Sequence, residues 1–409
     1  MAKEYKDLVV GLDIGTAKVM VVVAEVLPGG ELKLAGLGVA PSNGIKRGVV
    51  VNIDATVASI QQALREAELM ADCKITRVYT GITGSHIRGI NSSGMVAVKD
   101  REVTATDVAR VVETAKAINI STDQRLLLVE PQEFIIDGQD VRQPIGMSGI
   151  RLEAKVHIVT GAQSAAENIL KCVRRCGLEV EHLMLNPLAS SLSVLTEDER
   201  ELGVALVDIG AGTTDIAIFT NGAIRHTAVI PIAGDLITSD IAMALRTPTK
   251  DAEDIKVESG HAKQLLVDPE TQVEVPGLGD RGPRMLSRQA LAGVIEPRIE
   301  EIFSLVNQVM RESGYEEVLS SGIVLTGGSC IMPGMVELGE DIFLKPVRRG
   351  IPKYSSALAD MVAQPRAATV MGLLEEARMA RLRGYKVSQK NGSMKTAFSS
   401  VKDWFIGNF

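Results

Sequence analysis

The sequence predicts an α/β protein made of two duplicated halves. Apolar runs of strand length alternate with segments of helix length along the 409 residues. The tripeptide Asp-Ile-Gly occurs at residues 13–15 and again at residues 208–210, each time between two strand-like runs. Such a recurrence is typical of an internal duplication of a large unit. A content of 45% hydrophobic and 23% charged residues excludes a disordered, collagen-like or coiled-coil chain.

Each Asp-Ile-Gly lies at the turn of a predicted β-hairpin. In the first half the turn contains Gly15 and Thr16, and in the second half it runs from residue 208 to residue 215. The runs on either side of each turn are apolar, as expected of buried strands. These strands are predicted at residues 8–12 and 19–26 in the first half, and at residues 204–207 and 216–219 in the second.

The two turns carry the groups that phosphate binding requires. Glycines allow the backbone to approach an anion, while successive N–H groups and threonine hydroxyls can surround phosphate oxygens. Asp13 and Asp208 end the first strands and supply carboxylates for Mg²⁺, held through water. One such turn is usually only a turn, whereas two facing turns favour a clamp on one triphosphate. The residues assigned to the phosphates are Gly15, Thr16, Gly210, Gly212, Thr213 and Thr214.

A third element follows a buried strand predicted at residues 323–326. The strand leads into Gly327, Gly328 and Ser329, and the start of a helix is predicted at residues 331–338. Adjacent glycines at the carboxyl end of such a strand allow a flat base and ribose to lie against the backbone. In isolation, a glycine-rich helix cap is the alternative interpretation of these residues.

Together these motifs resemble a known family. Residues 13–18, 207–215 and 325–328 resemble, in order and spacing, the phosphate 1, phosphate 2 and adenosine motifs of the actin-like ATPase superfamily. Within it the chain resembles the FtsA family of bacterial cell-division proteins over nearly its whole length. The resemblance implies an actin-like fold that binds ATP and Mg²⁺ between its halves, with Lys18 as a further nucleotide residue. The most specific stretches are residues 67–73, 131–134, 191–203 and 294–298.

The resemblance also implies a division into subdomains, with insertions IC and IIB interrupting the two halves. For IC the sequence agrees, because a helix at residues 103–117 and strands at residues 125–136 and 151–160 suit a compact α+β unit. The expected ranges are IA at 1–83, 162–200 and 358–378, IC at 84–161, IIA at 201–238 and 315–357, IIB at 239–314, a flexible linker at 379–395 and an amphipathic helix at 396–409.

Subdomain IIB begins with residues 252–256, which resemble a superfamily segment whose Glu and Lys approach ribose and adenine. Glu253 and Lys256 are therefore assigned to the nucleotide. The alternative is a surface pair three residues apart on a helix, worth only about a few tenths of a kcal/mol. At Asp235 the chain departs from the second glycine of a superfamily motif, so no phosphate contact is assigned there.

The sequence assigns no catalytic base. Asn186 lies in the stretch where several relatives hold the attacking water. Its amide could orient a water molecule but accepts a proton poorly, and before a proline it also suits a turn. We therefore expect ATP hydrolysis to be slow or conditional.

The C-terminal residues predict a membrane contact. From residue 378 to residue 409 the chain has seven bases and one acid, although its net charge is −7. Residues 379–395 lack hydrophobic periodicity, and helical spacing then places apolar side chains on one face beside the single Trp. This pattern fits a helix in the interface of an anionic membrane, and the alternative is a helix docked on the protein. The residues assigned to the membrane are Phe398, Val401, Trp404, Phe405 and Phe409.

Partners follow from the resemblance. FtsA-like proteins form actin-like filaments, bind the C-terminal peptide of the tubulin-like FtsZ through IIB and contact later division proteins through IC. A helix predicted at residues 287–310 carries Arg288 and Arg298, which are assigned to the FtsZ peptide. A core-facing helix with solvated arginines is the alternative. The apolar positions expected beside the arginines are Leu291, Val294, Ile295 and Ile302.

Three functional classes fit the nucleotide motifs. A small-molecule kinase would not need the basic and aromatic C-terminal segment, and a chaperone ATPase would need a further domain after residue 376. A self-associating adaptor that tethers FtsZ filaments to the membrane and recruits later division proteins explains all features together. The absence of signal-peptide, membrane-spanning and disulfide patterns leads us to expect a cytoplasmic protein, and the resemblance implies the cytoplasmic face of the inner membrane at the division site. The negative net charge argues against nucleic-acid binding.

Overall fold

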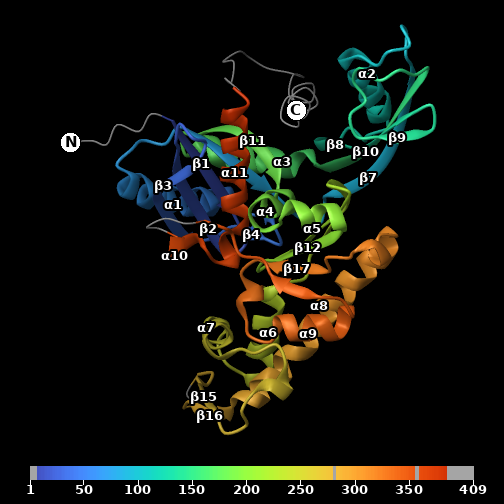
Figure 1. Ribbon diagram of the computed structural model, residues 1–409. Coiled ribbons are helices and arrows are strands. Elements are labelled where there is room, and N and C mark those ends of the chain that lie inside the picture. Colours follow the sequence, from blue (N-terminus) through green and yellow to red (C-terminus); the bar gives the residue numbers. More distant parts are fainter. Residues whose placement is uncertain (1–6, 280–281, 355–358, 385–409) are drawn as a thin grey trace.

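A computed structural model shows the fold and describes residues 7–279, 282–354 and 359–384. Two five-stranded sheets form its centre, with an insert beside them and a mainly helical lobe at the opposite end of the molecule (Figure 1). The first sheet has the strand order β11-β6-β1-β2-β3. Its strands are β1 (Leu8–Ile14), β2 (Lys18–Val26), β3 (Leu32–Pro41), β6 (Arg77–Ile82) and β11 (Glu179–Leu185).

The second sheet repeats the first. Its order is β14-β13-β12-β17-β18. When the first sheet is read from β3 to β11, both sheets have three antiparallel strands followed by two strands parallel to the third. The predicted duplication is thereby confirmed. The strands are β12 (Val204–Ile209), β13 (Thr214–Thr220), β14 (Ala223–Ile230), β17 (Ile323–Thr326) and β18 (Val347–Arg349).

Helices cover both faces of the first sheet, which explains why its central strands are apolar along their length. Neighbouring residues of β2 point to opposite faces, so Val21 shares an apolar cluster with Ile60, while Val22 shares another with Leu373. The helices are α1 (Ile53–Ala71) and α3 (Gln163–Arg175) on one face, and α4 (Asn186–Val194) and α11 (Ala368–Leu382) on the other.

The second sheet is covered in the same way. Ile218 of β13 lies in the cluster that contains Phe303, and Phe219 lies in a separate cluster with Val194. The helices on the first of these faces are α6 (Gly234–Leu245), α8 (Arg288–Ser313) and α9 (Met335–Phe343). The short helix α5 (Glu197–Leu202) precedes β12.

The insert after β6 has its own sheet and core. Val111 and Val112 of its helix pack in one cluster with Leu152 of the sheet. Thr104 caps the helix, because its hydroxyl accepts from the Asp107 N–H at 3.2 Å and the Asp107 carboxylate accepts from the Thr104 N–H at 3.0 Å. The α+β character predicted for this insert is confirmed. Its elements are α2 (Ala105–Lys116) and a sheet in the order β7 (Arg88–Ala97), β10 (Arg151–Ala162), β8 (Gln124–Ile136) and β9 (Gln139–Val141).

The lobe beyond the second sheet is built around α6 and α8. It adds α7 (Thr249–Ser259), the 3₁₀ turn η1 (Gln264–Leu266) and the hairpin of β15 (Gln272–Val275) with β16 (Arg284–Ser287). The remaining short elements are β4 (Ile45–Lys46), β5 (Val49–Val50), η2 (Glu316–Val318), η3 (Ser329–Ile331), α10 (Ala359–Val362) and η4 (Pro365–Ala367).

Two helix ends differ from the prediction. After Ser329 a 3₁₀ turn forms first, and α9 starts only at residue 335, because Gly334 has φ +84° and breaks the helix. Helix α11 continues to Leu382, into the range expected as a linker, because Arg381 pairs with Asp7 at 3.3 Å and with Glu181 at 3.6 Å. The predicted membrane residues 396–409 lie outside the described residues, as do residues 385–395. Within the described ranges, no helix is both long and apolar enough to cross a membrane.

Candidate functional site

The two turns have the same backbone geometry. The Gly15 N–H donates to the Lys18 carbonyl at 2.9 Å, and the Gly210 N–H donates to the Thr213 carbonyl at 2.9 Å. Both bonds close a hairpin between residues three apart, directly after the strand that ends in Asp-Ile. The predicted hairpins are confirmed, and the residues assigned to phosphate lie at their turns.

The turns touch each other where the two halves meet. A Cβ atom added at Gly212 would lie 2.6 Å from Oγ1 of Thr16 and 2.9 Å from Cα of Arg47. No side chain fits there without moving the opposite turn. The Thr16 hydroxyl also accepts from the Gly48 N–H at 3.2 Å. The structure therefore places the two predicted phosphate-binding turns face to face.

The third motif packs against the second turn. Gly327 has φ +89°, and a Cβ atom added there would lie 2.4 Å from Oδ1 of Asp208. The Ser329 hydroxyl donates to the Gly210 carbonyl at 2.7 Å. Gly328 has more room, since a Cβ atom there would lie 3.8 Å from Cβ of Arg366. All three motifs thus meet at one junction.

Glu253 and Lys256 lie beside this junction on α7. The Lys256 ammonium donates to the Glu253 carboxylate at 2.6 Å, to the Thr238 hydroxyl at 2.8 Å and to the Gly234 carbonyl at 3.2 Å. The Gly234 N–H in turn donates to the Gly210 carbonyl at 3.2 Å. The Glu–Lys pair is therefore connected to the second turn and is more than an isolated surface pair.

Asp13 and Asp208 are buried, and the half-buried Lys18 lies close enough to interact with both. Burial raises the pKa of Asp13 to about 6, with attraction from Lys18 opposing the shift and repulsion from Asp208 adding to it. Burial also raises the pKa of Asp208, against the hydrogen bond from the Ser190 hydroxyl at 2.6 Å. Burial lowers the pKa of Lys18, whose ammonium donates to the Arg366 carbonyl. An added cation would relieve the shifts of the two carboxyls, because it favours their charged form.

Sequence reasoning misses a third carboxylate, Asp215. It lies opposite Asp208 in the β12–β13 hairpin, and its two oxygens accept from the Thr83 hydroxyl and, at 3.0 Å, from the Thr213 hydroxyl. Burial and the nearby Asp208 raise its pKa to about 7. Because Thr83 follows β6, its bond to Asp215 joins the two halves. Its position at the end of the second motif was visible in the sequence, but its contact with Thr83 across the two halves was not.

The donor set fits a hydrated divalent cation better than a cage of protein ligands. In the part of the chain that the structure describes, no group of three or more His, Cys, Asp or Glu side chains is arranged to hold a metal ion. The junction instead offers the carboxylates of Asp13 and Asp208 and the hydroxyls of Thr16 and Thr213. Mg²⁺ commonly keeps several waters and bridges carboxylates to phosphate oxygens, which suits this set.

Asn186 begins α4 close to the junction. Its side-chain oxygen is buried and has no hydrogen-bond partner within the described ranges. A Cβ atom added at Gly81 of β6 would lie 2.1 Å from that oxygen. A buried oxygen without a partner is costly, and a water molecule would satisfy it. The geometry fits the expected role of Asn186 in orienting water, and the base stays unassigned.

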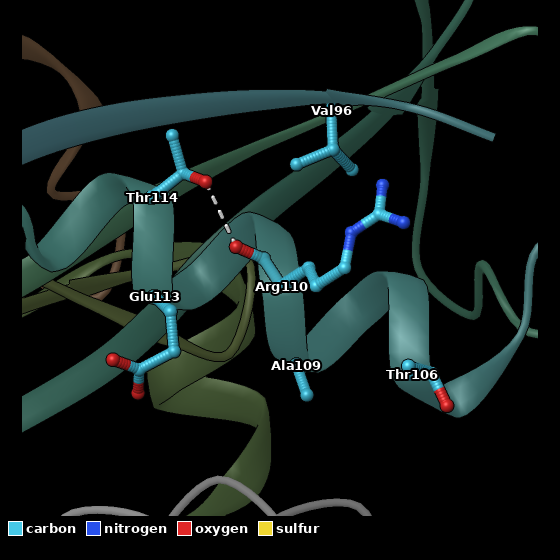
Figure 2. Close-up of a pocket in the computed structure, with 6 residues that line it drawn as sticks. All are labelled: Val96, Thr106, Ala109, Arg110, Glu113 and Thr114. Atoms are coloured by element: carbon cyan, nitrogen blue, oxygen red, sulfur yellow. Dashed lines mark hydrogen bonds between the residues drawn. The ribbon is translucent and has the colours of Figure 1, made fainter.

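Two open hollows lie away from the turns, on the insert. One of about 490 Å³ lies between α2 and β7 (Figure 2). The other, of about 540 Å³, lies where the insert meets the second half, and Lys155 and Tyr315 are among its lining residues. The turns are closed by their mutual contact at Gly212, so surface shape alone would not locate the motifs.

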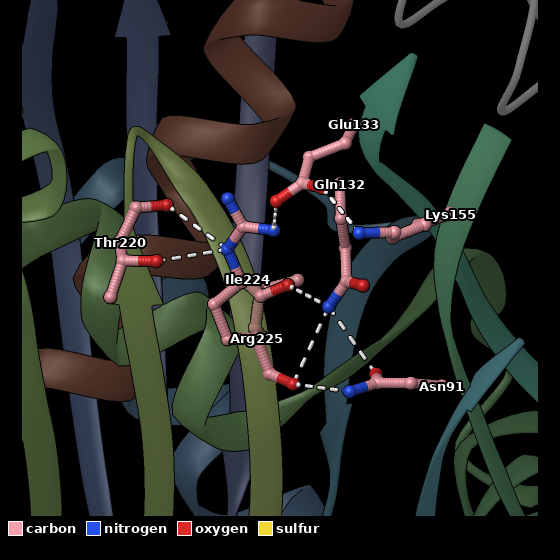
Figure 3. A network of polar contacts seen from close by, with 7 residues as sticks. All are labelled: Asn91, Gln132, Glu133, Lys155, Thr220, Ile224 and Arg225. Atoms are coloured by element: carbon pink, nitrogen blue, oxygen red, sulfur yellow. Dashed lines mark hydrogen bonds and ion pairs between the residues drawn. The ribbon is translucent and has the colours of Figure 1, made fainter. Parts of the chain in front are cut away.

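A polar network holds the insert on the second half (Figure 3). Arg225 of β14 pairs with Glu133 of β8 at 2.5 Å, and the Gln132 amide donates to the Ile224 carbonyl at 2.8 Å. The Asn91 amide donates to the Arg225 carbonyl at 3.1 Å. The Arg225 side chain is 5% exposed, which strengthens its ion pair with Glu133, while Asn91, Gln132 and Glu133 border the open hollow beside it.

The peptide-binding surface predicted on α8 is wrong in its apolar part. Leu291, Ile295 and Ile302 are buried in the core of the second half, and Val294 packs partly against the same core. The spacing of these residues defines a helix face, but it does not tell whether that face meets a partner or the helix's own domain. Here the face meets its own domain.

The two arginines assigned to the peptide already have partners. The Arg298 guanidinium is held by both oxygens of Asp240, at 2.5 and 3.0 Å, and also pairs with Glu301. The hydrogen bond to Asp240 raises the pKa of Arg298. Arg288 donates to the Ser259 carbonyl at 2.8 Å, at the end of α7. Both arginines join elements of the lobe, and their role toward FtsZ stays a prediction.

Comparison with known proteins decides the family. A family model described as "Cell division protein FtsA" matches residues 205–372, and one described as "SHS2 domain inserted in FTSA" matches residues 84–160. Cell division protein FtsA of Pseudomonas aeruginosa is 54% identical, over 98% of both chains, and that of Escherichia coli K12 is 48% identical, over 99% of both. The chain belongs to the FtsA family. The resemblance inferred from the motifs is confirmed.

Solved structures confirm the actin-like fold of this FtsA-family chain. A structure of the PilM-PilN type IV pilus biogenesis complex aligns with a TM-score of 0.65 at 17% identity, covering 92% of this chain and 99% of the other. MreB 5 of Spiroplasma citri bound to AMPPNP aligns with a TM-score of 0.57 at 16% identity, covering 93% and 99%. At such identities the shared property is the fold.

Proposed function

We propose that this FtsA-family chain binds Mg²⁺-ATP, assembles into actin-like filaments and tethers FtsZ filaments to the cytoplasmic face of the inner membrane. The observation that carries the proposal is the meeting of three glycine-containing motifs where the duplicated halves touch. Membership of the FtsA family supplies the role in cell division. Recruitment of later division proteins at the septal ring completes the proposed role.

The nucleotide site is the part of the proposal with the most structural support. The backbone of both turns and the hydroxyls of Thr16 and Thr213 would hold the phosphates, while Asp13 and Asp208 would order the water around the metal. When bound, the Mg²⁺ ion would supply the positive charge that the acidic cluster lacks, and ATP would supply the bond between its β- and γ-phosphates for hydrolysis. The MreB 5 relative of the same fold is bound to AMPPNP, which supports nucleotide binding here. With no base assigned, we propose only weak ATPase activity.

Filament formation is supported by a fold relative. A structure of the MamK double helical filament aligns with a TM-score of 0.51 at 12% identity, covering 90% of this chain and 99% of that chain. An actin-like chain can assemble head to tail when one end of a protomer fits the other. A filament would also raise membrane affinity, because many weak C-terminal anchors would act together.

The FtsZ peptide is proposed to bind the α6–α8 lobe. Because Leu291 and Ile295 are buried, the apolar contacts must come from other side chains of the lobe. Met243, Val257 and Leu265 are all more than two-thirds exposed there. Arg288 and Arg298 remain the proposed basic contacts, and they would have to share their charge with partners inside the lobe.

The experiment that tests the tether is FtsZ recruitment to vesicles that contain anionic lipid. Full-length chain with ATP should carry FtsZ into the vesicle pellet. A chain ending at Gly392, or one with Trp404→Glu, should bind ATP and FtsZ but leave both proteins in the supernatant. Equal pelleting of FtsZ by the full-length and truncated chains would refute the tether. Loss of pelleting with ATP binding retained in the truncated chain would separate the tether from the soluble-kinase alternative.

A further inference from the structure

Strand β7 is an edge strand of the insert's sheet, and some of its backbone N–H and C=O groups face away from the sheet. In its sheet β7 stands at one end of the strand order and pairs with β10. The Val98 N–H donates to the Ile150 carbonyl at 2.8 Å, which turns the even-numbered residues toward β10. The N–H and C=O groups of Ser93, Met95 and Ala97 therefore point away from the sheet. An edge of this kind is a template for an added strand.

A groove runs along this edge. A hollow of about 490 Å³ lies beside this edge, lined by one stripe of α2 and by Val96 of β7, and Figure 2 shows Val96 pointing toward Arg110. Gly94 lets the helix approach the strand, since a Cβ atom there would lie 2.5 Å from the Ala115 N and the Val111 O. A strand edge beside a helix is the geometry that peptide-binding domains use for strand addition. The lining residues are Val96, Thr106, Ala109, Arg110, Glu113 and Thr114.

Arg110 currently covers one end of the edge. Its guanidinium donates to the Ala97 carbonyl at 2.8 Å, an acceptor that the N–H of an added strand would use. The side chain is 38% exposed, and its acidic neighbour Asp107 lies 3.5 Å away. A long, half-exposed side chain can move aside at small cost. Arg110 thus protects the edge from unspecific pairing while leaving it available.

This end of the groove carries excess positive charge. The Asp107 carboxylate is buried and already accepts from the N–H and hydroxyl of Thr104, which caps α2. Arg110 and Lys99 both act on Asp107 and help to hold its pKa below the usual range. Since Glu113, the other acid that lines the groove, pairs with Lys116 at 2.5 Å, Arg110 and Lys99 are left with Asp107, which is committed to the helix cap. An incoming carboxylate would complete the charge balance.

We propose that the α2–β7 groove binds an extended peptide of another division protein by strand addition. The peptide pairs with the outward edge of β7, places an apolar side chain against Val96, and places an acidic side chain at the Ala97 end, where Arg110 and Lys99 receive it. The identity of the partner as a division protein rests on the proposed recruiting function of the insert. The groove itself rests on geometry and charge alone.

The test uses the full-length chain and a synthetic probe. Addition antiparallel to β7, as elsewhere in this sheet, brings the N-terminus of the peptide to the Ala97 end. The probe is therefore a fluorescent peptide of sequence Asp-Val-Thr-Val-Thr-Val-Thr, with one control peptide that has Lys in place of Asp and another with alternate backbone nitrogens methylated. Binding is followed by fluorescence anisotropy, and the site by hydrogen exchange.

We expect the probe to slow exchange in residues 92–98, and both control peptides to bind at least about tenfold more weakly. Met95→Pro removes only an N–H that points away from the sheet, so the protein should still fold but should no longer bind the probe peptide. Arg110→Glu should weaken binding by about tenfold or more, while Arg65→Glu, the same charge change on α1, should not.

Three outcomes would overturn the proposal. One is probe binding without slower exchange in residues 92–98. Another is equal affinity of wild type and Met95→Pro for the probe. The last is slower exchange there that grows with protein concentration in the absence of probe, which would assign the edge to a second copy of the chain. Met95→Pro should still carry FtsZ to vesicles, so failure of the groove and failure of the tether remain distinguishable.

Discussion

The β1–β2 and β12–β13 hairpins share one backbone and differ in charge. The residue opposite Asp13 across the first hairpin is Met20, whereas the residue opposite Asp208 across the second is Asp215. The duplicated halves have therefore kept strand register and turn geometry while the second half gained a carboxylate. Backbone equivalence between duplicated halves does not imply equal chemical roles.

The turns differ in a complementary way. Lys18 and Thr213 are equivalent, because each carbonyl accepts the bond that closes its turn. By the same alignment Ala17 corresponds to Gly212, yet Ala17 is exposed and Gly212 is buried against the opposite turn. The first turn thus supplies the positive charge of Lys18, and the second turn supplies, at Gly212, the close contact between the halves. Each of the following changes tests one part of this asymmetry.

The largest effect is expected from removing the equivalent carboxylates together, in Asp13→Ala/Asp208→Ala. Affinity for Mg²⁺-ATP should fall by about 100-fold or more, because both groups that order the metal water are lost. The unfolding temperature without nucleotide should stay the same or rise, since two carboxylates with unfavourable burial are removed. Calorimetric titration and thermal unfolding measure the two quantities. Unchanged ATP affinity in a folded double variant would sink the assignment.

The next effect concerns the contact between turns. Gly212→Val should destabilise the protein by about 1 to 3 kcal/mol and weaken ATP binding, because the new side chain collides with Thr16 and Arg47. Ala17→Val is the matched control, and it should change stability by less than about 0.5 kcal/mol at an exposed position. Urea unfolding of both variants decides the point. Equal losses would show that the two turns are equivalent after all.

The third effect is a pH dependence that comes mainly from the second half. The pKa of Asp215 is about 7 and that of Asp13 about 6, both raised from 3.8 by burial. The folded state thus holds protons that the unfolded state has released, so stability without nucleotide should fall as pH rises from about 4 to about 7. A loss of at least about 1 kcal/mol is expected between pH 5 and pH 7.5.

Asp215→Asn is the matched variant for this pH profile. It removes the group with the larger shift and should flatten the upper part of the profile, leaving the part below about pH 6. Denaturant unfolding at several pH values measures both chains. A variant profile that superimposes on that of the wild type would mean that Asp215 does not titrate in this range.

The sequence predicted the features that depend on local pattern. Asp-Ile-Gly between apolar runs was enough to locate both hairpins, and the third motif was found from Gly327 and Gly328. Asp215 was missed because its proximity to Thr83 comes from the docking of two halves, which spacing along the chain does not reveal. The α8 surface failed for the same reason, since Leu291 shows its burial only once the lobe is assembled.

The smallest effect tests the bond that joins the halves. Thr83→Val removes the hydroxyl that donates to Asp215 and that lowers the pKa of this carboxyl. The pKa should therefore rise further, and the decline of stability should extend to higher pH than in the wild type. At pH 8 we expect a loss of about 1 kcal/mol, and a smaller loss at pH 5, where Asp215 is protonated.

Thr80→Val is the matched control for Thr83→Val, because it makes the same change three residues earlier on β6. The Thr80 hydroxyl donates to the Leu12 carbonyl at 2.8 Å, entirely within the first half. Its loss should cost a similar free energy at both pH values, since a carbonyl does not titrate. If Thr83→Val behaves like Thr80→Val at pH 5 and pH 8, the Thr83 hydroxyl acts on packing alone. A loss confined to the higher pH would establish that the first half holds the extra carboxylate of the second in its charged form.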